Sequence, residues 1–534
     1  MQKIIKIASI WKIIAFACMG VALCSPASAK MTKWPSYPSF TSTARDVPWL
    51  IVKCAFSDEK DARVLPPGLN SDIKDLDTYI KLFLTTDGAG TGNISDYYSN
   101  VSYGAISFAG SRIVGWYTLP FSKKNAPARF NVAQQCANSI STADAADIDF
   151  DKYQGIVAVT NDYHDGGACA IGKTSMSIFG KTHQLACIVL DPGSMWTAFA
   201  AHEFGHGLGF QHSWDTTPCE YCDAYDVTSA CDTWQFGNPN YPPSVLETTT
   251  IPGFCQGGAG PGLNIPNLLK LNVIPAAETA TWKVGSQPQV FVLTALSHPE
   301  SGLPLTVQLV GSKPKDIYTV EYRQTDGWDK GLPQNAVMIH EYKIGPSPYS
   351  YLQEGPSGVN GAWTAGGASW QNGNFGAVAT VLAIDPIQAT ATVSIGPTCA
   401  KCPPPPTCKA STDCSGELTI SCSGPNVGVI FNGNCRKPGS ESLTCTAGFT
   451  GASMVSAGGD VEWFGSTTVP NTAQACTRNA AGSTCIAVQT PIPAACPGLP
   501  NSNVPTCSEG ERWCTKLSPP RCAPDSQCLL IRAP

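Results

Sequence analysis

The chain has 534 residues, of which 14% are charged, and its formal net charge is −6. This length predicts about three domains, and the charged fraction is well below the roughly one quarter of ordinary soluble domains. The low charge, together with 50 glycines, 43 prolines and 24 cysteines, is typical of a loop-rich extracellular protein. No basic tract interleaved with aromatic residues is present, which excludes nucleic acid as an expected partner.

Residues 1–29 are predicted to be a signal peptide. Three lysines precede an apolar run over residues 13–23, and the segment ends in Ala27-Ser28-Ala29, which indicates cleavage after Ala29. The apolar run is too short to cross a bilayer, and no later stretch is long enough. We therefore expect a secreted, extracellular protein without a membrane span. Its mature net charge would be −6 − 3 = −9, because three lysines and no acids are removed.

Residues 30–46 are expected to form a short polar lead, and residues 47–283 an α+β domain. Strand-like and helix-like stretches alternate there, which predicts a twisted mixed sheet with helices packed on it. The expected strands are residues 50–56, 106–119, 155–160 and 185–190. The expected helices are residues 73–85 and 129–144, with a further helix near residues 264–274.

The segment HEFGHGLGFQH, residues 202–212, contains three of the seven histidines. Residues four apart share one face of a helix, so His202 and His206 should point the same way. Gly209 should end the helix, because glycine readily adopts the left-handed conformation, and the turn would bring His212 back towards the other two. Glu203 flanks the two imidazoles, which is a suitable place for a base that acts on metal-activated water.

This histidine pattern predicts a catalytic zinc site. Three imidazoles with an open fourth position are typical of catalytic zinc, whereas structural zinc is usually closed by four protein ligands. We expect one Zn²⁺ bound by His202, His206 and His212, with Glu203 as the catalytic residue. The alternative is an ordinary surface or core histidine group, or a degenerate relative of an enzyme that has lost its activity.

Residues 284–396 are predicted to form a β-sandwich, because short β-rich runs are separated there by turn signals about every ten residues. Its two histidines, His298 and His340, are isolated in the sequence and are expected to be ordinary surface or core residues. Residues 397–407 contain four consecutive prolines and predict an extended spacer.

Residues 408–534 are expected to be one or two small Cys-rich modules, whose role is open between binding and protease resistance. After the signal peptide 22 cysteines remain, eight up to Cys255 and fourteen from Cys399 onward. Both counts are even, which is consistent with full disulfide pairing in an oxidising compartment. Disulfides are also favoured over structural zinc at Cys219-x-x-Cys222 and Cys399-x-x-Cys402, because neither has a second such pair at suitable spacing.

The extended histidine pattern is the metzincin signature, and the chain resembles that clan of zinc endopeptidases, in particular the secreted gametolysin and immune-inhibitor-A type. The resemblance covers residues 47–396. AYDVTS stands where relatives carry a Tyr-Asp-Val-Met stretch, so Thr228 replaces a methionine, and the floor of the site is expected to be looser or bridged by a water. The segments that resemble relatives are VPWLIVKCAFSD, DYYSNVSYGAISFAG, IVGWYTLP, YQGIVAVTND, YTVEYRQTDGWDKGLP and AVMIHEYK.

The resemblance implies a multidomain protein with a metzincin-like catalytic domain over residues 47–283, in which the zinc helix packs beneath a twisted mixed sheet. The β-sandwich and the disulfide-rich C-terminal modules would follow. It implies a secreted zinc metalloendopeptidase that hydrolyses peptide bonds by metal-activated water, with Glu203 as general base. The implied partners are protein or peptide substrates, among them extracellular matrix, cell-wall glycoproteins and host defence proteins. For Tyr225 a structural role is favoured over a role at the oxyanion.

Two other functions stay open at this point. The chain could be a catalytically disused metzincin scaffold that acts as a surface-binding protein through its Cys-rich tail, and it would then hydrolyse no unfolded protein. It could also be a zinc hydrolase of non-peptide amides, which would spare casein and cleave small amides.

Overall fold

The computed structural model describes residues 31, 33–34, 44–66, 73–217, 219–242, 258–313, 315–345, 347–355, 361–365 and 369–398, apart from the side chains of residues 230–232. Beyond these it describes the backbone of strands between residues 407 and 524. The predicted signal peptide, most of the lead over residues 30–46 and the four consecutive prolines of the spacer lie outside the described residues. The architecture is mixed, with several sheets and few helices, in agreement with the expected multidomain α+β class.

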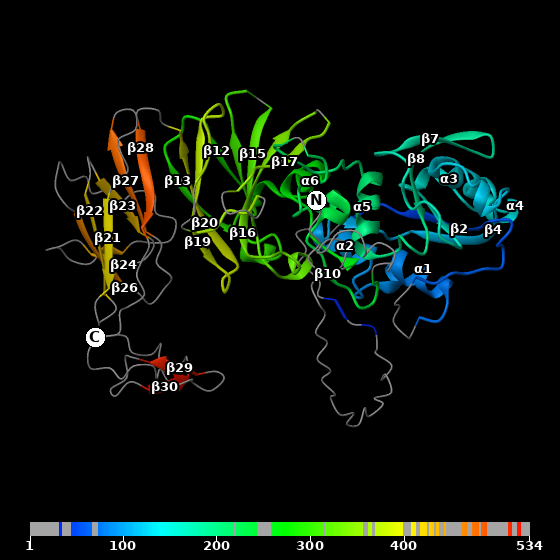
Figure 1. The fold of residues 1–534 in the computed structure, drawn as a ribbon, viewed down its shortest axis with the longest axis horizontal. Helices are drawn as coiled ribbons and strands as arrows, with labels where there is room; N and C mark the ends of the chain where they lie inside the picture. The colour runs from blue at the N-terminus through cyan, green and yellow to red at the C-terminus, as the bar shows by residue number, and fades with distance from the viewer. Residues whose placement is uncertain are drawn as a thin grey trace, which may run out of the picture.

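A mixed sheet with the strand order β4-β2-β5-β8-β6 forms the first unit (Figure 1). Four strands are parallel, while the short β6 and β7 pair antiparallel with β8. Alternate residues of β2 enter different cores, Trp49 and Ile51 on one face and Leu50 and Val52 on the other. Both faces are covered, which explains the continuous apolar runs of the central strands. The strands are β2 Trp49–Ala55, β4 Arg112–Thr118, β5 Gly155–Thr160, β6 Gly167–Ala168, β7 Thr174–Ile178 and β8 Lys181–Leu190.

Helices cover both faces of this sheet. The third helix, α3, packs on one face through Val132 and Cys136, and Cys136 forms a disulfide with Cys54 of β2. On the other face, Tyr98 of α2 and Phe204 of α5 belong to a single core that also contains residues of α1 and α6. The helices are α1 Leu76–Leu84, α2 Ile94–Val101, α3 Arg129–Asn138, α4 Thr142–Ala146, α5 Thr197–Gly207 and α6 Ile265–Leu271.

Two predicted elements are divided in the structure. The strand expected over residues 106–119 consists of β3 (Ile106–Ser107) and β4, and the turn between them contains Gly110 at φ +82°. The helix expected over residues 129–144 consists of α3 and α4, because the Ser141 hydroxyl caps a new helix. In both places a turn or cap residue overrides the period of the apolar pattern. Short pairs complete the unit: β1 Arg45–Asp46 with β3, and β10 Phe236–Gly237 with β11 Gly258–Ala259.

Two further sheets share one core in the second unit, with the orders β12-β14-β15-β16-β17-β9 and β13-β20-β19-β18. Trp282, Tyr322 and Val393 lie in this common core. Since β12 pairs with β14, the consecutive strands of this unit begin at Thr279, and β9 joins the first sheet from an earlier part of the chain. The strands are β9 Trp214–Asp215, β12 Thr279–Lys283, β13 Gln289–Thr294, β14 Thr306–Val310, β15 Asp316–Arg323, β16 Ala336–Lys343, β17 Ser350–Leu352, β18 Trp370–Asn372, β19 Ala377–Asp385 and β20 Thr390–Pro397.

The two units are joined by a shared sheet. Strand β9 follows His212 closely in the chain and pairs in parallel with β17 of the sandwich, with Trp214 opposite Tyr351 and Asp215 opposite Leu352. The segment that carries the third histidine is therefore a strand of the sandwich sheet as well as a part of the first unit.

A buried arginine also joins the units. Arg323 of β15 is fully buried and contacts Asp329 through Nε and Nη2, at 2.7 and 2.5 Å, and Glu321 through Nη1, at 3.0 Å. Glu321 in turn accepts a hydrogen bond from the backbone N–H of Ile265 at the start of α6 (2.7 Å). Because a buried charge without a partner is costly, this network fixes α6 against the sandwich.

His340 of β16 forms a second buried pair at the junction. Its Nε2 lies 3.0 Å from Oδ2 of Asp223, and its Nδ1 lies 3.8 Å from Oε2 of Glu321. Burial lowers the pKa of His340, but the charges of Asp223, Glu321 and Asp226 outweigh burial and raise that pKa above its ordinary value. Burial likewise raises the pKa of Asp223, and the charge of His340 outweighs it, so this carboxyl has a lowered pKa. Both shifts favour the ionised form of the pair, which links β16 to the segment after His212.

Replacing His340 with Gln should destabilise the protein, because Asp223 and Glu321 would lose their buried cation; breaking such a pair costs about 3–5 kcal/mol. The folded-state pKa of His340 is raised, so its contribution is complete below the unfolded-state pKa of about 6.5 and is lost as pH rises through the folded value. Denaturant titrations should therefore show the largest difference between wild type and His340→Gln at the acidic end of the range from about pH 5 to about pH 9. A pH-independent difference would contradict the assignment. The control His298→Gln removes an imidazole that is 35% exposed and should matter far less.

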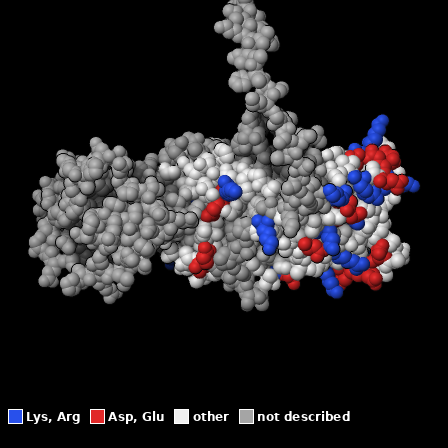
Figure 2. All heavy atoms as spheres, turned by 90° about the horizontal axis from the view of Figure 1, so that it is seen from below, with Lys and Arg blue, Asp and Glu red and all other residues white. Residues whose placement is uncertain are grey.

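Charged side chains on the described surface form several ion pairs. Figure 2 shows one face of the molecule, on which acidic and basic side chains are interspersed, mostly at the end that carries α3 and α4. The described pairs include Lys53–Asp77 at 2.5 Å, Lys123–Asp162 at 2.5 Å and Arg129–Asp165 at 2.6 Å.

The strands described beyond residue 407 pair with one another. They form three sheets, with the orders β21-β22-β26-β24-β25, β23-β27-β28 and β29-β30. Among the described residues, no helix is long and apolar enough to span a membrane. The strands are β21 Thr407–Thr412, β22 Glu417–Ser423, β23 Val427–Phe431, β24 Asn434–Arg436, β25 Leu443–Thr444, β26 Val461–Ser466, β27 Ala473–Asn479, β28 Gly482–Val488, β29 Glu511–Cys514 and β30 Arg521–Pro524.

Candidate metal centre

Helix α5 is buried because two of its glycines admit close neighbours. A Cβ atom on Gly205 would lie 2.9 Å from the ring of Phe210, and one on Gly207 would lie 2.5 Å from the ring of Trp49 in β2. A larger residue at Gly207 would push the helix away from the sheet, and one at Gly205 would displace Phe210. The two glycines inside HEFGHGLG therefore set the depth at which the histidines are held.

The helix ends in a Schellman arrangement around Gly209, which has φ +96°. The backbone N–H of Phe210 donates to the carbonyl of Gly205, and that of Gly209 donates to the carbonyl of His206, both at 2.9 Å. This is the usual glycine-dependent end of a helix, and it reverses the chain direction within a few residues. The reversal brings His212 to the face of α5 that carries the other histidines.

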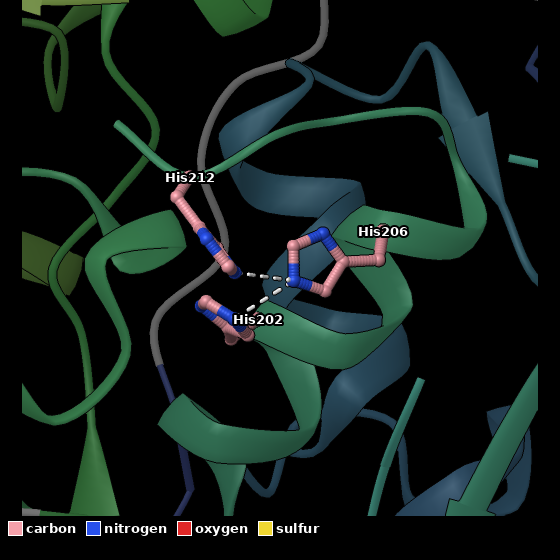
Figure 3. A group of neighbouring side chains, drawn as sticks. All are labelled: His202, His206 and His212. Atoms are coloured by element: carbon pink, nitrogen blue, oxygen red, sulfur yellow. Dashed lines mark hydrogen bonds between the residues drawn. The ribbon is translucent and has the colours of Figure 1, made fainter. Parts of the chain in front are cut away.

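The three histidines point into one space, two from α5 and one from the segment after it (Figure 3). Nε2 of His206 lies 2.9 Å from Nε2 of His202 and 3.1 Å from Nε2 of His212. Their possible ligand atoms all lie within 4.8 Å of one another. His202 and His206 are only 3% and 6% exposed. The structure thus brings together the three residues that the spacing singled out.

Backbone carbonyl groups fix the two helical imidazoles. Nδ1 of His202 lies 3.1 Å from the carbonyl oxygen of Val227, and Nδ1 of His206 lies 2.9 Å from that of Phe210. A carbonyl oxygen can only accept, so each Nδ1 carries the proton and each Nε2 presents a lone pair. Metal-binding histidines are commonly oriented by this kind of contact.

The third imidazole is held by a side chain. Nδ1 of His212 lies 2.5 Å from Oε1 of Glu220, which accepts a hydrogen bond from it in the same way. All three Nε2 lone pairs therefore face one another at close range. Such an arrangement is repulsive by itself and is favourable around a cation.

The donor set fits zinc. Two nitrogens bound to one tetrahedral zinc ion at about 2.0–2.1 Å are separated by about 3.3 Å, which is close to the observed 2.9 and 3.1 Å. Burial lowers the pKa of each imidazole; for His202 the neighbouring His206 lowers it further, and for His212 the contact with Glu220 opposes burial. Neutral imidazole is the form that binds metal.

Glu203 lines the same cavity as the three histidines, and the volume of this cavity is about 670 Å³. The side chain is largely buried, and its Oε2 accepts a hydrogen bond from the backbone N–H of Ala168 in β6 (2.6 Å). Burial raises the pKa of Glu203, although the Ala168 N–H and the charge of Arg129 act in the opposite direction. A fixed carboxyl with a raised pKa beside three imidazoles has the properties of a general acid–base group.

Thr228 lies beneath His202 in the 3₁₀ helix η4 (Val227–Asp232) and is fully buried. We expected a looser floor or a bridging water here, but protein groups satisfy the hydroxyl. It donates to Oδ1 of Asp226 at 2.5 Å and lies 2.8 Å from the hydroxyl of Ser213. Burial and the charge of Asp223 raise the pKa of Asp226 to about 6. The floor of the site at Thr228 is thus a network of polar groups that hydrogen-bond one another, where the resemblance implies a methionine side chain.

Replacing Thr228 with Val should lower the free energy of unfolding by about 1–3 kcal/mol, because Asp226 loses a buried donor and the Ser213 hydroxyl keeps only its contact with Asn264, while the shape is retained. Thr228→Met should cost more, since the longer side chain must also displace its neighbours. Chemical denaturation of the three proteins measures both effects. A Thr228→Val variant as stable as wild type would contradict the role given to the hydroxyl.

Two residues at the site were not singled out in the sequence. Glu220 contacts His212, and Tyr221 lines the cavity with its ring centroid 4.0 Å from that of His212. Both lie between Cys219 and Cys222, which are joined by a disulfide, so the CxxC spacing was the signal that could have found them. The corresponding pair at Cys399 lies outside the described residues.

Tyr225 is placed away from the cavity. It is fully buried in a small core with Met338 and Leu352, and it is not among the residues that line the cavity. Its surroundings are those of a structural residue.

The chain matches no protein-family model and no curated protein sequence.

Proposed function

We propose that the chain is a secreted zinc metalloendopeptidase of the metzincin type. The observation that carries this proposal is the convergence of three imidazole lone pairs beside Glu203 in one cavity. The helix that bears the histidine pattern lies against a mixed sheet with an antiparallel edge strand, which supports a metzincin-like catalytic domain. The three disulfides among the described residues suit an oxidising, extracellular compartment.

His202, His206 and His212 would hold the zinc ion, which when bound polarises a carbonyl group and makes water more acidic. Glu203 accepts the proton of the attacking water and later delivers it to the leaving amine. The Ala168 N–H orients the Glu203 carboxylate through Oε2, so the proton is exchanged at a fixed position.

The edge strand β6 is well placed to bind an extended peptide. It ends the strand order of the mixed sheet, and Gly166, Ala168 and Ala170 line the cavity with the histidines. The Ala168 N–H of this strand is bonded to Glu203, so we propose that an extended peptide lies alongside β6 in the cavity and does not take that group. A peptide bound there would pass the histidines with chain on both sides, which favours an endopeptidase over a hydrolase of small amides.

Glu203→Ala should lower hydrolysis of an unfolded protein such as casein by about 10²–10⁴-fold, the usual contribution of a general base. Zinc content should stay the same, because all three histidines remain. The matched control is Glu278→Ala, which removes another carboxyl with a pKa raised by burial, at the start of the sandwich. Release of labelled peptides and zinc content per chain measure the two properties. A Glu203→Ala variant that hydrolyses casein at the wild-type rate would contradict the assignment of Glu203 as general base. A loss of zinc would indicate that Glu203 is a metal ligand.

A zinc chelator should abolish casein hydrolysis, and added Zn²⁺ should restore it. Hydrolysis that is unaffected by the chelator would contradict a zinc peptidase. A zinc-loaded chain that cleaves neither casein nor small amides would favour the surface-binding scaffold, and one that cleaves small amides alone would favour the amide hydrolase.

A further inference from the structure

The third histidine is held less firmly than the other two. His202 and His206 are buried, and their Nδ1 atoms contact backbone carbonyl groups. His212 lies in the segment after α5 with its side chain 20% exposed, and its Nδ1 contacts the carboxylate of Glu220, which is itself 47% exposed. A backbone carbonyl has no rotamers, whereas an exposed carboxylate must lose rotamer freedom to stay in place. The position of His212 therefore depends on what restrains Glu220.

A short hairpin brings Glu220 to His212. Trp214 forms an antiparallel bridge with Glu220, and the backbone N–H of Asp215 donates to the carbonyl of Cys219 at 3.2 Å. The carboxylate of Asp215 also accepts the backbone N–H of Cys219 at 3.2 Å. The first arm is β9, which the sandwich strand β17 fixes from its other side. The first arm is thus anchored independently of the second.

The second arm is closed by the Cys219–Cys222 disulfide, with Glu220 and Tyr221 as the two residues between the cysteines. Tyr221 has φ +68°, a left-handed conformation that a bulky residue seldom adopts without an external constraint. Its ring centroid lies 4.0 Å from that of His212, at an interplanar angle of 38°. Within the ring closed by the disulfide, Glu220 therefore contacts Nδ1 of His212, and Tyr221 lies against the face of the same imidazole.

We propose that the Cys219–Cys222 disulfide holds His212 in the ligand position by acting through Glu220, and that reduction of this disulfide weakens zinc binding. The inference rests on the proposed zinc site. Glu220 is a positioning residue: it orients the imidazole and does not contact the metal or substrate.

The reductant is a dithiol. One of its sulfurs attacks the disulfide, and its second sulfur then releases the protein, so two electrons and two protons pass to Cys219 and Cys222 while the dithiol becomes a disulfide. Both cysteines are partly exposed. Among the other described disulfides, Cys54 and Cys136 are both fully buried, and Cys169 is partly exposed but is joined to Cys187, which is 1% exposed. Cys219–Cys222 is thus the described disulfide in which both cysteines are partly exposed, and we expect a mild reductant to attack it first.

The first test is the zinc affinity of Glu220→Ala, measured on the full chain by competition with a chromophoric chelator. Loss of a partner that orients a histidine ligand typically lowers metal affinity by about 10- to 100-fold, and we expect a decrease in this range. Glu220→Gln should recover most of the affinity, because its amide oxygen still accepts from Nδ1. The matched control is Glu300→Ala, which removes a 50% exposed carboxylate at 3.0 Å from Nδ1 of His298 in the sandwich, and it should leave zinc affinity unchanged.

The second test asks whether the disulfide acts through Glu220. The double variant Cys219→Ser, Cys222→Ser lacks the disulfide and also lacks thiols that could bind zinc, and it should show the same decrease as Glu220→Ala. Combining all three substitutions should produce no further decrease, because residues that act as a unit are not additive. If the fold-decrease in zinc affinity of the combined variant equals the product of the two separate fold-decreases, the proposal is overturned. A Glu220→Ala variant with wild-type zinc affinity would also overturn it.

Zinc affinity needs no catalysis, so the two proposals can fail separately. Wild-type zinc affinity in Glu220→Ala, together with chelator-sensitive hydrolysis, overturns this inference alone. A zinc-loaded wild type that hydrolyses no casein overturns the proposed function. The zinc affinities of the variants would then still decide whether the disulfide acts through Glu220. A chain that binds no zinc overturns both.

Discussion

Three Nε2 lone pairs that face one another at 2.9 and 3.1 Å repel, and a cation between them would relieve that repulsion, so the site depends on what holds each imidazole in this orientation. Each Nδ1 proton has its own acceptor, and the acceptors come from three different segments. Phe210 belongs to the turn that ends α5, Val227 to the segment beneath the helix, and Glu220 to the hairpin after His212. The orientation of the donor set is therefore a property of the folded chain and not of the histidine pattern alone.

Hydrogen bonds from the sandwich help to hold the acceptor of His202 in place. Asn264, at the start of α6, donates from its backbone to Asp226 at 2.6 Å and from its side chain to Ser350 of β17 at 2.9 Å. Asp226 in turn caps the turn that contains Thr228 and precedes the Val227 carbonyl. A chain of short hydrogen bonds thus runs from a sandwich strand to the acceptor of His202. In a low-dielectric interior such contacts are rigid because an unpaired polar group is costly.

The sequence predicted the local parts of the site and missed the long-range ones. The period of four, the glycine stop and the returning third histidine depend on neighbouring residues, so they could be inferred from spacing. The contact of His340 with Asp223 joins residues 117 positions apart, and nothing in the local pattern around either residue indicates it. The floor of the site at Thr228 was expected to be looser or bridged by a water. The local sequence does not show that Ser213, on a different segment, contacts the Thr228 hydroxyl. The split of the strand expected over residues 106–119 reflects turn geometry that overrides apolar periodicity.

The pairing of β9 with β17 also has a consequence for the order of events during synthesis. Ribosomes deliver the chain from its amino end, so the three histidines emerge long before residues 350–352. Until then β9 has no neighbouring strand on one side, and the arm that follows His212 is not anchored. Domains usually fold as units as they appear. Here one arm of the first unit is paired by the second, so we expect the segment after His212 to become fixed only once residues 350–352 have emerged.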